Sequence, residues 1–169
     1  DEYVECENLN YLDALRPETC DVLGLVGVQS HQFHRALDIA ALARSQGVRH
    51  IVMGGPHPIT CDTSQFHGSG VSFALSEAEL IWGRILADAT EGGLLPLYGK
   101  EQRWQRELET SALTPPTAAE MQKYVMPMLG IYPSRGCPFD CNFCSVVDIA
   151  GHLIRSEPVE GTLESLHRA

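Results

Sequence analysis

The chain has no apolar run that approaches the roughly 20 residues of a membrane-spanning helix, and its first residues do not resemble a secretory signal peptide. Basic residues are scarce, because 12 Lys plus Arg stand against 22 Asp plus Glu, for a formal net charge of -10. An acidic surface repels phosphate backbones, so general nucleic-acid binding is not expected, although a local patch could still accept a tRNA. Internal repeats and low-complexity tracts are also missing. We therefore expect a soluble, cytoplasmic protein without a transmembrane segment.

The first part of the chain, residues 1–93, alternates short apolar runs with helical patterns. This alternation predicts an α/β fold, a Rossmann-like parallel sheet joined by crossover helices. Strands are expected at 22–26, 48–53 and 71–75. One helix is expected to be capped by Ser30 and ended by Gly47, and a second to start at a capping box formed by Ser76 and Glu79.

Residues 94–128 are interrupted by Pro96, Pro115, Pro116 and Pro127, which predicts an ordered linker. The third part, residues 129–169, predicts a strand at 129–133 and a helix at 157–168. Three apolar side chains of that helix, Val159, Leu163 and Leu166, are expected to point inward.

Between that strand and that helix, Cys137, Cys141 and Cys144 have the spacing Cys-x3-Cys-x2-Cys. Three thiolates on one short loop can hold three corners of a 4Fe-4S cluster and leave the fourth iron open. A structural zinc site is the alternative, and it would need a fourth ligand such as His152. The other cysteines are scattered singly and are expected to be small buried hydrophobes: Cys6, Cys20 and Cys61.

With Ser134 and Arg135 leading into it, the loop at 136–144 resembles the cluster loop of the radical S-adenosylmethionine (SAM) enzymes. The resemblance implies that the three thiols hold the cluster, that its open iron binds SAM, and that Phe143 lies near the adenine. Arg155 also matches the family's pattern after the loop. It could neutralise the cluster, contact SAM, or simply be a solvated arginine ahead of a helix.

In open parallel sheets, ligands bind outside the carboxyl ends of the strands. The loops expected there carry the candidate cofactor-binding residues Ser30, Gly54, Gly55, Pro56, His57, Ser76 and Glu77. The glycines and the proline could equally form only a turn, and Ser76 and Glu77 only a helix start.

The order of these loops resembles the cobalamin-binding domain that precedes the barrel in cobalamin-dependent radical SAM proteins. A Gly-Gly-Pro-His loop and a Gly-Glu-x-Glu loop recur in that family, and here Ser76 replaces the second motif's Gly. The Asp-x-His-x-x-Gly motif that supplies a cobalt ligand elsewhere has only a near match at 65–70, with Gln65 in place of Asp. No protein histidine on cobalt is therefore expected.

The resemblance implies a segment of a cobalamin-dependent radical SAM enzyme that cleaves SAM reductively and performs methyl transfer or cyclisation on an unknown small molecule. An electron donor such as flavodoxin or ferredoxin would be its partner. The first βα unit of the cobalamin domain and most of the roughly 250-residue barrel are expected to be missing, so this chain alone should be inactive. The alternative is a non-catalytic Rossmann-like ligand-binding module with a structural zinc-binding Cys loop.

Overall fold

The structure is a computed structural model, and it describes residues 20–108 and 132–168. The chain divides into two compact units, Asp1–Trp104 (unit 1) and Gln105–Ala169 (unit 2). Each unit is described by itself. The division of the sequence at 1–93, 94–128 and 129–169 stays a prediction.

Unit 1 contains a four-stranded sheet in which every neighbouring pair is parallel. The strand order is β1-β2-β3-β4, and the strands are β1 (Val22–Leu25), β2 (His50–Gly54), β3 (Ser72–Ala74) and β4 (Leu97–Tyr98). In the register, Leu23 lies opposite Ile51, and Met53 lies opposite Phe73. The α/β, Rossmann-like fold predicted from the sequence is confirmed, and the first three strands lie within a few residues of their predicted positions.

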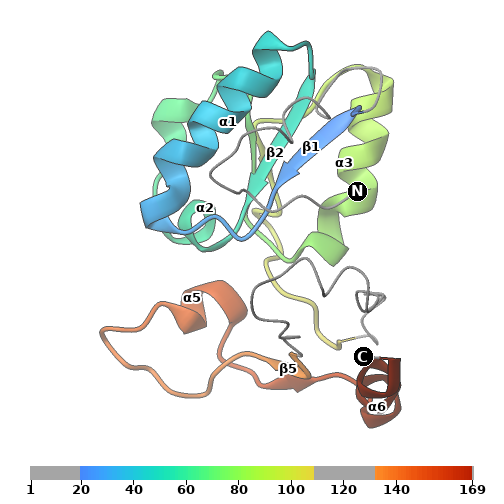
Figure 1. Cartoon of the computed structure of the whole chain (residues 1–169). Helices are drawn as coiled ribbons and strands as arrows, with labels where there is room; N and C mark the ends of the chain where they lie inside the picture. Colours follow the sequence, from blue (N-terminus) through green and yellow to red (C-terminus); the bar gives the residue numbers. More distant parts are fainter. Residues whose placement is uncertain (1–19, 109–131, 169) are drawn as a thin grey trace, which may run out of the picture. The chain divides into compact units, whose positions relative to one another are not determined.

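Helices cover both faces of this sheet (Figure 1). They are α1 (Phe33–Ser45), the short α2 (Pro56–Thr60) and α3 (Ala78–Glu91), with the 3-10 turns η2 (Ser30–Gln32) and η3 (Ser64–Phe66). Along β2, Ile51 and Met53 face the cluster under α1, whereas Val52 faces the cluster under α3. This alternation follows from the two-residue period of a strand, and it explains why residues 51–53 of β2 are apolar without a break.

The sheet face that α1 covers is packed against α1 residues three and four positions apart, because such positions lie on the same side of a helix. They are Phe33, Ala36, Ile39, Ala40 and Ala43, all buried. Gly47 follows the last turn with φ 102°, and its N–H donates to the carbonyl of Arg44 at 2.9 Å. The predicted glycine stop of this helix is therefore confirmed.

The strand β4 was not predicted, because it lies in the stretch read as a linker. Tyr98 is buried in the cluster with Val52, Ala74, Ile81 and Ile85. Its hydroxyl donates to Asp88 at 2.7 Å and accepts the N–H of Leu95 at 3.0 Å. These two bonds join β4 and the segment before it to α3.

The two serine caps predicted from the sequence are wrong. Ser30 lies in η2, and α1 begins only at Phe33. The hydroxyl of Ser76 donates to the carbonyl of Glu77 at 3.3 Å instead of capping α3, whose N-cap residue is Glu77. The N-cap residue is Gln32, two residues after Ser30, for α1, and Glu77, one residue after Ser76, for α3.

In its described residues, 105–108 and 132–168, unit 2 contains a two-stranded antiparallel sheet, β5 (Ser134–Arg135) with β6 (Arg155–Ser156), and the helices α5 (Val146–Ala150) and α6 (Val159–Arg168). Of the strand predicted at 129–133, residues 129–131 lie outside the described residues, and Tyr132 and Pro133 are not in a strand. The barrel part of the expectation is thus not shown in the described residues.

The prediction that the apolar side of α6 points inward is wrong. Its three large apolar side chains are Val159, Leu163 and Leu166, and they are 67%, 48% and 52% exposed. Among the described elements of unit 2, a two-residue ladder and a five-residue helix offer little surface against which α6 could bury them.

Candidate functional site

The loops after β1 and β2 are joined by backbone hydrogen bonds at the carboxyl ends of these strands. The N–H of Val28 donates to the carbonyl of Gly54 at 3.0 Å, and the N–H of His57 donates to the carbonyl of Val28 at 3.0 Å. Because β1 and β2 are parallel neighbours, their ends meet at one edge of the sheet, as the sequence predicted.

Packing inside the protein explains why both positions of the Gly-Gly-Pro-His loop at 54 and 55 are glycines. Gly55 has φ 131°, where a side chain is strained, and a Cβ there would overlap the backbone N of Val28. A Cβ on Gly54 would lie 3.3 Å from the Cβ of Ala74 on β3. The space beside both glycines is thus occupied by the protein's own atoms.

Ser30 and His57 are brought together at this edge. The Nδ1 of His57 and the hydroxyl oxygen of Ser30 are 3.1 Å apart, within hydrogen-bonding distance. The imidazole also lies against Phe33, with ring centroids 4.0 Å apart and an interplanar angle of 30°. Burial, and to a lesser extent the charge of nearby His34, lowers the pKa of His57 below its ordinary value. A neutral imidazole at pH 7 is therefore available as a hydrogen-bonding group.

The third predicted loop is more enclosed. Ser76 is buried, and a Cβ on Gly99 would overlap its hydroxyl oxygen. The backbone N–H of Glu77 donates to the carbonyl of Arg103 at 2.8 Å. Ser76 therefore has no exposed hydroxyl to offer, whereas Glu77 is only half-buried.

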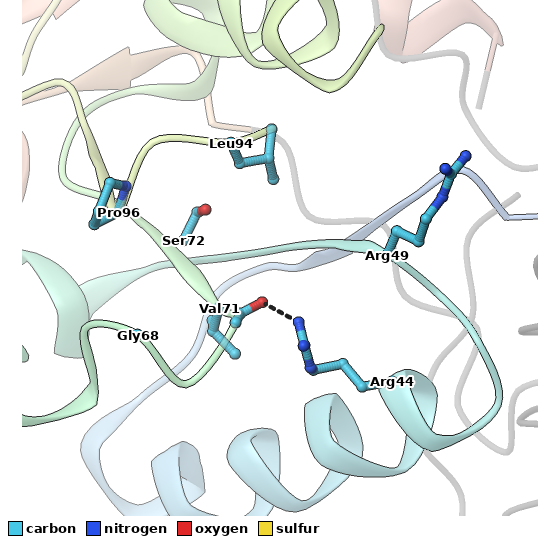
Figure 2. A pocket seen from close by; sticks show the side chains of 8 residues that line it. Arg44, Arg49, Gly68, Val71, Ser72, Leu94 and Pro96 are labelled. Carbon is cyan, nitrogen blue, oxygen red and sulfur yellow. Dashed lines mark hydrogen bonds between the residues drawn. The ribbon is translucent and has the colours of Figure 1, made fainter. Parts of the chain in front are cut away.

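A pocket of about 220 Å³ lies at the opposite, amino edge of the sheet (Figure 2). Its lining includes Arg44 at the end of α1, Arg49 just before β2, and Val71 and Ser72 at the start of β3. Arg44 donates to the carbonyl of Gly70 at 3.1 Å, which fixes its guanidinium on the protein's own backbone. The pocket is separate from the loops that the sequence analysis selected.

In unit 2 the Cys loop is closed at its base. Cys137 donates its N–H to the carbonyl of Gly151 at 3.0 Å, and Glu157 donates its N–H to the carbonyl of Pro133 at 2.8 Å. Gly136 has φ 99°, and a Cβ there would overlap the carbonyl oxygen of Leu153. The two arms of the loop are thus in backbone contact, and Gly136 is the residue that permits the closest approach.

The other two thiols lie between this base and α5. The N–H of Cys144 donates to the carbonyl of Cys141 at 2.9 Å, which forms a turn, and α5 begins two residues after Cys144. Cys137 and Cys144 are half-buried, Cys141 is exposed, and none of the three is in a disulfide. Phe143, within the turn, is 91% exposed.

The chemistry of three free thiols on one closed loop fits an iron–sulfur cluster or zinc. As they stand, however, no three or more His, Cys, Asp or Glu side chains within residues 20–108 and 132–168 are placed to hold a metal ion together. The assignment of this loop therefore rests on spacing and donor chemistry. It does not rest on a preformed arrangement of metal ligands.

The remaining cysteines differ from one another. Cys20 is half-buried and packs against the core under α1. Cys61 is exposed, so the expectation that it is buried is wrong, because it follows the last residue of α2 on the surface. Cys6 lies outside the described residues.

Sequence reasoning named Arg155 but missed its burial, which contradicts the alternative of a solvated arginine, and it missed how two glycines shape the Cys loop. Gly136 and Gly151 both have positive φ, and Arg155 is buried, with hydrogen bonds to two backbone carbonyls. For Gly136, the available sequence signal was its position directly before the first cysteine. The burial of Arg155 had no sequence signal, since arginine is usually exposed.

Comparisons with known proteins found no matching family model. Two bacteriochlorophyllide d methyltransferases of Chlorobaculum tepidum are similar in sequence. The C-12(1)-methyltransferase is 24% identical over 138 residues, and the C-8(2)-methyltransferase is 28% identical over 140 residues. Each alignment covers 78% of this chain but only 28% and 30% of the relatives, so the chain spans less than a third of their length.

A search for membrane-spanning helices in the described parts of the chain gave none of sufficient length and apolar character. The chain is thus an α/β protein with a parallel Rossmann-like sheet, a second unit with a closed three-thiol loop, and distant similarity to two methyltransferases.

Proposed function

We propose that this chain is a segment of a cobalamin-dependent radical SAM enzyme that transfers a methyl group to a small-molecule substrate. The observation that carries the proposal is the Cys-x3-Cys-x2-Cys spacing on a loop whose two arms are joined by the hydrogen bond between Cys137 and Gly151. The two relatives are named as methyltransferases, which favours methyl transfer over cyclisation. The whole enzyme would act in the cytoplasm with an electron donor such as flavodoxin or ferredoxin.

Cys137, Cys141 and Cys144 would hold a 4Fe-4S cluster. When bound, such a cluster supplies the electron for reductive cleavage of SAM. The protein's part is to fix the thiols on one short loop and to leave one coordination position without a protein ligand. The exposed ring of Phe143 offers an apolar face next to Cys144, suited to contact with an adenine.

Cobalamin would bind at the carboxyl edge of the sheet in unit 1. The hydrogen-bonded pair of Ser30 and His57 presents polar groups there, and Glu77 lies after the neighbouring strand β3. Gly54, Gly55 and Pro56 would set the loop's path, and Ser76 would contribute through its backbone, since its hydroxyl is buried. No histidine of this chain is proposed as a ligand to cobalt.

The test is a cofactor analysis of the 169-residue chain after anaerobic reconstitution with iron and sulfide and incubation with hydroxocobalamin. Iron, sulfide, zinc and cobalt are measured on the same desalted sample. The proposal predicts close to four iron and four sulfide per chain for a 4Fe-4S cluster, and cobalt retained with the protein.

Stoichiometric zinc without iron or sulfide would overturn the proposal and favour a structural Cys loop. In that case His152, which is exposed and follows Gly151, is the fourth ligand to test. Iron and sulfide without cobalt would retain the radical SAM part and remove the cobalamin part.

A further inference from the structure

Arg155 is a buried arginine whose guanidinium bridges two separate backbone segments of unit 2. The residue is 6% exposed. One terminal nitrogen, Nη1, donates to the carbonyl of Gln105 at 2.9 Å, and the other, Nη2, donates to the carbonyl of Ala150 at 2.9 Å. An arginine is seldom buried unless its N–H groups have such partners, because desolvation of the guanidinium is costly.

The carbonyl of Ala150 is connected through the backbone to both outer cysteines, Cys137 and Cys144. Ala150 is the last residue of α5, and α5 starts just after Cys144. The next residue, Gly151, accepts the N–H of Cys137 with its own carbonyl. The group that Arg155 holds is therefore adjacent to the hydrogen bond that fixes Cys137 and at the end of the helix that follows Cys144.

The middle thiol is connected to the same segment. Cys141 accepts the N–H of Cys144 with its carbonyl, so the turn that carries Cys141 ends at the start of α5. Each of the three cysteines is thus joined by the backbone to the peptide that Arg155 holds. The second carbonyl, from Gln105, fixes the guanidinium itself from the amino-terminal side of unit 2.

We propose that Arg155 is a positioning residue for the three-thiol loop. Its guanidinium does this by donating hydrogen bonds to the carbonyls of Ala150 and Gln105. The proposal rests on the proposed function of the loop as a cluster site. It differs from a role in charge neutralisation, because a lysine would keep the charge but could not reproduce two hydrogen bonds in fixed, diverging directions. Arg155→Lys therefore separates the two roles.

The first measurement is amide hydrogen exchange on the metal-free 169-residue chain. Wild type is compared with Arg155→Lys and Arg155→Met, and with Arg106→Met, which removes an exposed arginine next to Gln105. We expect exchange at the amides of Cys137 and Cys144 to accelerate by on the order of tenfold in both Arg155 variants. The amide of Val52 in unit 1 should keep its rate in every variant.

Wild-type exchange rates at both cysteine amides in Arg155→Lys would overturn the proposal. If Arg155→Met fails to fold, Arg155→Lys decides alone, because it keeps the length and charge of the side chain.

The second measurement is iron and sulfide per chain after anaerobic reconstitution. Loss of a residue that orients metal ligands lowers metal affinity by roughly 10–100-fold, so both Arg155 variants should retain less iron than wild type at limiting iron, and Arg106→Met should match wild type. Full retention in Arg155→Lys would contradict the positioning role and point to charge. Absence of iron from the wild-type chain would instead overturn the proposed function, and the exchange rates would still report whether Arg155 orders the loop.

Discussion

The imidazole Nδ1 of His57 lies 3.1 Å from the hydroxyl oxygen of Ser30, which joins the turn after β1 to the helix after β2. Two backbone hydrogen bonds between Val28 and the pair Gly54 and His57 run alongside it. The loop motif selected from the sequence as a ligand loop is therefore also a connection between two strand ends. Its residues can be tested for this structural role without any cofactor.

The pKa of His57 should lie below its ordinary value of 6.5, because burial and then the charge of His34 disfavour the imidazolium. Since the unfolded chain then binds this proton more readily, the free energy of unfolding should be largest above about pH 6.5 and decline as the pH falls toward the folded-state pKa. NMR titration of the His57 ring gives the pKa directly. A value at or above 6.5 would contradict the burial described here.

In the same titration, His34→Gln should raise the pKa of His57, because it removes the second of the two causes. His57→Gln should flatten the pH dependence of the urea midpoint between about pH 7.5 and pH 5.5. An unchanged dependence in that variant would assign the acid sensitivity to other groups.

Gly55→Ala should lower the free energy of unfolding by about 1–3 kcal/mol or more, because it combines a strained positive φ with overlap on the backbone of Val28. Gly54→Ala should cost about 1 kcal/mol, since its new methyl meets only the Cβ of Ala74 at 3.3 Å. Urea denaturation of the cofactor-free chain measures both.

A double-mutant cycle provides the control for these two glycines. Ala74→Gly should reduce the destabilisation caused by Gly54→Ala, which would appear as a favourable coupling free energy between the two substitutions. It should show no coupling free energy with Gly55→Ala. If Gly55→Ala is as stable as wild type without cofactor, the close approach of the two loops is not what requires this glycine, and a ligand contact becomes its main explanation.

Tyr98→Phe should lower the free energy of unfolding by about 1–2 kcal/mol. The change removes the hydroxyl that donates to Asp88 at 2.7 Å and accepts from Leu95 at 3.0 Å, inside the cluster under α3. Burial, together with Asp88, raises the pKa of the Tyr98 phenol, which keeps it protonated as a donor at neutral pH.

Arg84→Ala is the matched control for Tyr98→Phe, because Arg84 contacts the same carboxylate from the surface, with Nε 3.8 Å from Oδ2 of Asp88. An exposed pair of this kind contributes less than about 0.5 kcal/mol. Equal effects of the two substitutions would mean that β4 is not held to α3 through Tyr98.

The parallel sheet could be predicted from the sequence because its strands are short apolar runs buried on both faces, as β2 shows with Ile51, Val52 and Met53. The strand β4 could not. Leu97 and Tyr98 form only a two-residue strand after a proline, and what makes it a strand is pairing with Phe73 and Ala74 far earlier in the chain. The local sequence pattern does not indicate such a tertiary partner.

The same limit applies to the candidate sites. The three thiols were identifiable because their spacing is itself the chemical signal, whereas the base of their loop depends on contacts of Gly136 with Leu153 and of Cys137 with Gly151. The helix caps failed for a related reason. Ser30 and Ser76 matched a local motif, but the first bonds with His57 and the second is buried beside Gly99.

The proposal that the loop at 136–144 holds a 4Fe-4S cluster can be tested by the iron and sulfide content of single cysteine variants. Cys137→Ser, Cys141→Ser and Cys144→Ser are reconstituted anaerobically beside Cys20→Ser and Cys61→Ser, which alter two cysteines in the described residues of unit 1. Each loop variant is expected to lose most of the iron and sulfide and the absorbance of the cluster, while both control variants should match wild type. Wild-type iron and sulfide in any two of the loop variants, or loss in the controls alone, would contradict the proposal.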